Sequence, residues 1–151
     1  MKKILFSFAT IAIISTSFWA CGSNEGAVKE AENDVFAIHD EVMPKVGKIM
    51  KLQKQLKQRI SSLDSLKETG SAAATLRISE DREQASRLSQ NLRVADSLMM
   101  NWMGGYNGDT LAKLSSEEAL NYLAAQNDQI TDVKTKVNTS IDQASQFLGK
   151  K

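Results

Sequence analysis

The sequence predicts an all-α protein, an antiparallel bundle of three long helices. Apolar residues recur every three or four positions from Val28 almost to the end of the chain, which is the period of an amphipathic helix. No stretch alternates apolar and polar residues as a half-buried strand does. Glycine-containing breaks divide the periodic part into three segments of about 40, 25 and 33 residues, which must pack side by side.

The first predicted helix runs from Val28 to about Lys67 and contains Pro44, the only proline of the chain. Proline inside a helix removes one backbone hydrogen bond and crowds the preceding turn, at a cost of ~3 kcal/mol. We therefore expect a kink at Pro44, whereas a chain that folded back there would have four helices. The kink is favoured because the apolar seam keeps its phase across the proline. That seam is Val35, Ile38, Val42, Val46, Ile49, Leu52, Leu56, Ile60, Leu63 and Leu66.

The second predicted helix begins near Ser79, after the break around Gly70. The Ser79 hydroxyl is placed to cap the acidic turn that follows it. The apolar seam of this helix is Ala85, Leu88, Leu92, Ala95, Met99 and Met103. Because the second helix returns antiparallel to the first, we expect Trp102 to pack near the bend at Pro44, in a cluster of aromatic residues and methionines.

The third predicted helix follows a loop over residues 104–109, where three glycines disfavour a helix. Ser115 and Glu118 have the spacing of a capping box, and the helix runs to about Gly149. Polar residues at Gln126 and Asn127 interrupt the seam, a pattern that fixes register in coiled coils. The apolar members of the seam are Ala119, Leu123, Ile130, Val137, Ile141, Ala144 and Leu148.

The N-terminal segment 1–20 has the features of a signal peptide. Two lysines precede an apolar stretch of about eleven residues, which is too short to span a bilayer of ~30 Å. The segment ends in Ser-Phe-Trp-Ala before Cys21, the only cysteine. This ending resembles a bacterial lipoprotein signal, although Phe18 and Trp19 depart from the small residues typical of that pattern. The alternative is an ordinary secretory signal followed by an unrelated cysteine.

The resemblance implies that Cys21 is lipidated and that residues 21–27 form the lipidated cysteine and a tether, followed by a bundle domain over 28–151. Stable anchoring requires more than one acyl chain, and lipoprotein processing supplies them. In some bacterial groups an acidic run follows the cysteine of surface-exposed lipoproteins; none follows Cys21, which for such a group favours a protein that faces the periplasm, and the outer membrane is the expected location. Removal of the signal changes the formal net charge from +1 to −1, so nucleic acid is not an expected partner.

Residues 37–50, AIHDEVMPKVGKIM, hold the only histidine of the chain. His39, Met43 and Met50 lie within about 40° of one another on a helical wheel, beside the apolar seam. The methionines near the end of the second helix, Met99, Met100 and Met103, are expected at the same level. One histidine with several thioether sulfurs suits Cu(I), and a histidine–methionine pair is a haem axial set. The alternative is that the methionines fill gaps in the packing and that His39 forms a hydrogen bond at the bundle's edge.

Other chemistries lack the necessary residues. One histidine cannot form a zinc-protease motif, and there is neither a phosphate-binding glycine loop nor a Cys-x-x-Cys-His haem attachment. We therefore expect no enzyme activity and no required cofactor. The predicted function is a non-enzymatic envelope lipoprotein that binds an envelope protein or the cell wall, and the alternative is the copper- or haem-binding bundle.

The stretch from His39 to Leu52, together with Trp102 and Met103, resembles a group of small uncharacterised Bacteroidota lipoproteins that are sometimes labelled viral A-type inclusion protein-like. The label reflects their coiled-coil composition. The resemblance implies a helical lipoprotein and adds no mechanism.

Overall fold

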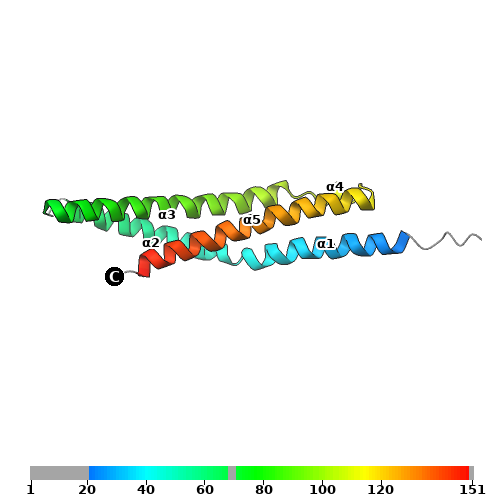
Figure 1. The fold of residues 1–151 in the computed structure, drawn as a ribbon, viewed down its shortest axis with the longest axis horizontal. Helices are drawn as coiled ribbons and strands as arrows, with labels where there is room; N and C mark the ends of the chain where they lie inside the picture. Colours follow the sequence, from blue (N-terminus) through cyan, green and yellow to red (C-terminus); the bar gives the residue numbers. More distant parts are fainter. Residues whose placement is uncertain (1–20, 68–70, 150–151) are drawn as a thin grey trace, which may run out of the picture.

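The computed structural model describes residues 21–67 and 71–149, and within these ranges all regular structure is helical. Three helices, α1 (Cys21–Val42), α2 (Lys45–Lys67) and α3 (Ala72–Gly105), are followed by a single turn, α4 (Gly108–Leu111), and by α5 (Ser116–Gly149). Figure 1 shows α1 and α2 following one another along the long axis, with α3 and α5 beside them. α1 packs mainly on α5, and α2 packs mainly on α3. The predicted all-α bundle with a bent first helix is confirmed.

The bend lies at Met43 and Pro44, which form a turn between α1 and α2. The Met43 N–H donates to the His39 carbonyl at 2.9 Å, and the Val46 N–H donates to the Met43 carbonyl at 3.2 Å. The apolar phase continues through this turn. Residues spaced by seven along α1 and α2 are all at most 2% exposed: Val35, Val42, Ile49, Leu56 and Leu63. Val42 therefore faces the core as expected, whereas Val46 is only half-buried.

We expect Pro44→Ala to lower the free energy of unfolding by ~0.5–1 kcal/mol. Pro44 directly precedes α2, where a missing N–H removes no helical bond and a fixed φ lowers the entropy of the unfolded chain. A matched change of opposite sign is Gly47→Ala, because Gly47 is exposed in α2 and an added Cβ meets nothing within 4 Å. Thermal melts measure both, and a melting temperature that rises for Pro44→Ala contradicts this account.

The core is a continuous apolar cluster that runs along the bent pair α1–α2 and along α3 and α5. On α5 it follows two interleaved seven-residue spacings, as in a coiled coil. The spacing from Leu123 to Ala144 is apolar throughout. The spacing from Ala119 to Phe147 includes two buried polar residues, Gln126 and Ser140. The seam prediction is wrong at Leu66, which is 52% exposed. Leu66 lies near the end of α2, where the pair formed by α2 and α3 extends past the end of α5 (Figure 1).

Three helix boundaries differ from those predicted. α1 begins at Cys21, so residues 21–27, expected as a tether, are helical. α3 begins at Ala72 because residues 72–74 are alanines, the strongest helix formers, and Ser71 rather than Ser79 occupies the capping position. α3 also continues through Gly104 and Gly105. The signal-peptide prediction for residues 1–20 lies outside the described residues.

The predicted capping box at the start of α5 is confirmed. The Glu118 N–H donates to the Ser115 hydroxyl at 3.4 Å, and the Glu118 carboxylate accepts from the Ser115 N–H at 3.0 Å. The Ser115 hydroxyl also donates to that carboxylate at 2.7 Å. These hydrogen bonds lower the pKa of Glu118. They fix where the chain turns from α4 into α5.

Candidate functional site

An aromatic cluster joins α1, α3 and α5 around the predicted site. The ring of His39 lies 5.6 Å from that of Trp102, which lies 5.6 Å from that of Tyr106. Phe36 packs edge-on against Tyr106 at 5.1 Å, and Tyr122 on α5 lies 6.0 Å from Tyr106. Trp102 thus packs one turn before the bend, as expected, but its ring neighbours are aromatic residues and His39. We call these five residues the aromatic cluster.

The hydroxyls of both tyrosines in the aromatic cluster are hydrogen-bonded. The Tyr106 hydroxyl donates to the Glu32 carboxylate at 2.9 Å, and the Tyr122 hydroxyl accepts from the Asn107 N–H at 2.9 Å. Partial burial raises the pKa of Tyr106 far above its usual value, and the hydrogen bond and negative charge of Glu32 raise it further. Tyr106 therefore stays protonated and acts as a donor. The cluster ties α1 to the end of α3.

The structure distributes the candidate copper and haem ligands between the core and the surface. His39 is partly buried, and its Nδ1 lies 2.9 Å from the Asp40 carboxylate. Met99 is fully buried, whereas Met50 is 60% and Met100 55% exposed. Met43 is exposed, and Met103 is partly buried against the core. Within the described residues no three or more His, Cys, Asp or Glu side chains form a metal-binding group. The copper or haem hypothesis stays a prediction, which titration tests by absorbance for haem and by thermal shift for Cu(I).

Trp102 also lines a groove between α3 and α5. The volume of this groove is about 440 Å³, within the range of roughly 300–1,000 Å³ typical of ligand pockets. Trp102 therefore contributes both to the aromatic cluster and to the wall of this groove. We call it the α3–α5 groove; it is lined by Leu98, Asn101, Trp102, Gly105, Gln126, Gln129, Asp132, Val133 and Lys136.

Gln126 is the most unusual residue of the α3–α5 groove. Its side chain is only 8% exposed, yet its carboxamide has no hydrogen-bond partner among the described residues. Two side-chain polar atoms of the described chain are fully buried without a partner, Trp102 Nε1 and Ser145 Oγ, and the Gln126 amide is not one of them. The small surface that Gln126 keeps therefore includes its amide, which opens into the groove.

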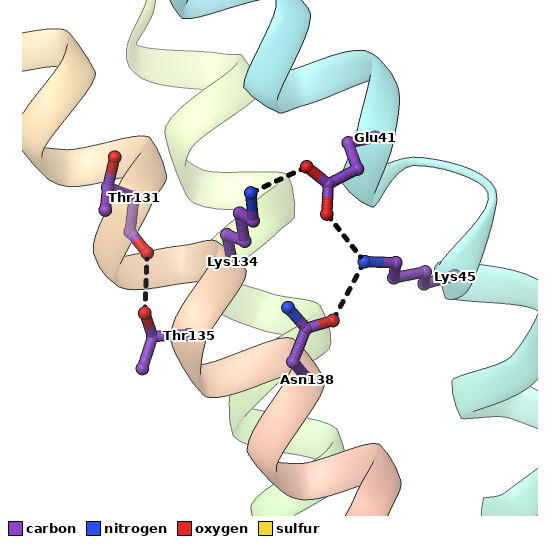
Figure 2. Close-up of polar contacts among 6 residues, drawn as sticks. All are labelled: Glu41, Lys45, Thr131, Lys134, Thr135 and Asn138. Atoms are coloured by element: carbon purple, nitrogen blue, oxygen red, sulfur yellow. Dashed lines mark hydrogen bonds and ion pairs between the residues drawn. The ribbon is translucent and has the colours of Figure 1, made fainter.

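A polar clamp holds α5 against both sides of the bend. In Figure 2, Glu41 near the end of α1 reaches Lys134 on α5 at 2.6 Å and Lys45 on α2 at 3.1 Å. Lys45 also donates to the side-chain carbonyl of Asn138 at 2.9 Å. We call Glu41, Lys45, Lys134 and Asn138 the bend clamp. The hydroxyl of nearby Thr135 donates to the Thr131 carbonyl of its own helix and takes no part.

We expect the bend clamp to stabilise the protein at neutral pH and to weaken in acid. Hydrogen bonds from Lys134 and Lys45 lower the pKa of Glu41 below its usual 4.5. Because the folded-state pKa is lowered, the stabilisation is present above pH 4.5 and is lost as the pH falls through the lowered value. Melts of the wild type and Glu41→Gln should differ at about pH 6, and the difference should shrink progressively as the pH falls below 4.5.

The matched control for the bend clamp is Glu30→Gln, an exposed change on the same helix. Because Glu41 is exposed, its effect should be modest and should shrink with added salt. A difference for Glu41→Gln that stays constant down to acid pH contradicts an ionic clamp.

The sequence pointed to His39 and the methionines, and it missed the α3–α5 groove. Gln126 was recognised as a polar interruption of the seam but was interpreted as a register device. The other two carboxamides of the groove belong to Asn101 and Gln129, which are exposed residues on their helices. Nothing in the sequence distinguishes them from ordinary surface residues.

Comparisons with protein-family models, curated proteins and solved structures find no match to this chain. Functional inference therefore rests on the sequence and on the geometry of the site.

Proposed function

We propose that this chain is a non-enzymatic lipoprotein of the cell envelope, anchored through Cys21 at the outer membrane and facing the periplasm, whose helical bundle binds an envelope partner or the cell wall. The lipoprotein-like ending of segment 1–20 supports the anchor. No helix in the described part of the chain is both long and apolar enough to cross a membrane. The observation that carries the binding role is the α3–α5 groove with the unpaired amide of Gln126.

The position of Cys21 determines how an anchored bundle is oriented. α1 begins at Cys21, and its first turns lie beside α4 and the start of α5. Figure 1 shows this end of the bundle opposite the end at which α2 finishes and α3 begins. A helix of 34 residues such as α3 is about 50 Å long. Lipid at Cys21 therefore holds the α4 end near the bilayer and projects the α2–α3 end away from it.

We expect a fluorophore at position 113 to be quenched by a quencher carried on lipid headgroups, and the same fluorophore at position 71 not to be quenched. Lys113→Cys and Ser71→Cys are matched exposed positions at opposite ends of the bundle. Acylated Cys21 leaves no other thiol to label. The lipidated protein is reconstituted in vesicles and its emission is measured. Equal quenching at both positions contradicts the end-on orientation.

A further inference from the structure

We propose that the α3–α5 groove binds a short extended peptide segment, whose main-chain amides pair with the carboxamides of Asn101, Gln126 and Gln129. The inference deepens the proposed function and rests on it in one respect, namely that the bundle is a binding module. The groove itself is present whether or not the chain is anchored.

Gln126 is a polar residue at a core position of α5. Its position in the seven-residue spacing of α5 is otherwise apolar or satisfied: Ala119, Val133 and Phe147 are buried, and the Ser140 hydroxyl donates to the Asn91 carbonyl on α3 at 3.4 Å. Most of the Gln126 side chain is buried, and its amide has no hydrogen-bond partner among the described residues, so the groove is where that amide can meet a ligand in place of water. A ligand that supplies both an acceptor and a donor can pair with this amide, so Gln126 marks the floor of a binding site.

The length of the groove suits a few peptide residues. On α3 it is lined from Leu98 to Gly105, two helical turns or about 10 Å. An extended chain covers about 3.3 Å per residue, so about three residues fill this length. On α5 the lining extends from Gln126 to Lys136, about 15 Å, so that side of the groove is somewhat longer.

The chemistry of the lining favours peptide over sugar. A carboxamide donates through its N–H groups and accepts through its oxygen, as a peptide group does. Partly buried Leu98, with the small exposed edges of Trp102 and Val133 beside it, supplies an apolar contact for one side chain of the ligand. Trp102 is only 6% exposed, so it offers little ring face on which a sugar could stack. Exposed Asp132 and Lys136 at the rim present one charge of each sign.

The test titrates the purified protein, with its native N-terminus, with N-acetylated tripeptide amides that carry Ala, Leu or Phe in the centre. Removal of segment 1–20 leaves Trp102 as the only tryptophan, so its fluorescence reports on the groove. The side-chain amide signal of Gln126 in NMR spectra gives a second readout. We expect saturable binding, with the leucine or phenylalanine peptide tighter than the alanine one.

Two variants and one matched control locate the binding. Gln126→Leu removes the amide and suits the apolar seam, so the protein should melt higher and bind at least about tenfold more weakly. Gly105→Leu adds a side chain to the groove wall and should also weaken binding by about tenfold or more. Gly104→Leu is the control, because Gly104 is its exposed neighbour outside the groove and an added Cβ meets nothing within 4 Å at either glycine.

The inference is overturned if none of the peptides binds at concentrations up to about 10 mM, if Gly104→Leu and Gly105→Leu weaken binding equally, or if oligomers of N-acetylglucosamine bind in place of the peptides. Membrane fractionation is scored separately. Peptide binding by a protein that proves soluble refutes the anchor and leaves the groove intact, whereas an anchored protein without peptide binding does the reverse.

Discussion

Replacing Cys21 by serine should abolish membrane attachment, the largest effect expected for any single change in this chain. Under the lipoprotein proposal the Cys21 thiol accepts a diacylglycerol group, which a serine hydroxyl does not accept, so the signal should stay uncleaved or the protein should be released in soluble form. Stable anchoring depends on several acyl chains, and this substitution removes all of them. Fractionation, the mass of the processed chain and incorporation of labelled palmitate measure the outcome.

The matched control for Cys21→Ser is Asn24→Ala, an exposed change one turn further along α1. It should leave processing and fractionation unchanged. If Cys21→Ser still matures normally and still requires detergent for extraction, the lipoprotein proposal is wrong and segment 1–20 is an ordinary secretory signal.

Ile49→Ala should lower the free energy of unfolding by about 2–5 kcal/mol, the range for truncating a buried aliphatic side chain. Ile49 is fully buried one heptad after Val42, just beyond the bend. The cavity it leaves removes packing where α2 first contacts its neighbours, and a bundle three helices wide has few other contacts there to compensate. Denaturant unfolding followed by circular dichroism measures the loss.

Met50→Ala is the neighbouring control, because Met50 is 60% exposed and its truncation should change stability by less than about 0.5 kcal/mol.

Met50→Ala also bears on the copper or haem alternative. If added Cu(I) or haem stabilises the wild type but not Met50→Ala or His39→Ala, that alternative gains support. A loss for Met50→Ala as large as that for Ile49→Ala contradicts the burial described here.

The continuous phase across Pro44 shows why the bundle was predictable. Val42 and Ile49 stand one heptad apart on either side of the proline, and burial of both faces is possible only if the two helices continue in line. A sequence pattern records this requirement directly because the period of the apolar residues is the period of the helix. The capping box at Ser115 was predictable for a similar reason, since both partners lie within one turn.

Helix ends were harder to predict, because weak local signals compete there. The alanines at 72–74 extend α3 upstream of Ser79, and Gly104 and Gly105 stay helical despite their entropy cost. Leu66 fits the apolar period of α2 but lies where α5 no longer covers the pair of helices. Periodicity specifies which face of a helix is apolar, whereas the neighbour's length decides where that face is buried.

The sequence alone determined the helical class, the phase of each helix, the bend, and the N-terminal features that motivate the lipoprotein proposal. Only the tertiary structure determines whether the two polar residues in the core of α5 have hydrogen-bond partners. Ser140 finds the Asn91 carbonyl on α3, whereas Gln126 finds no partner among the described residues and opens into the α3–α5 groove. The physical reason is that a hydrogen bond depends on what the adjacent helix presents at that level, and no pattern within one helix specifies its neighbour's atoms.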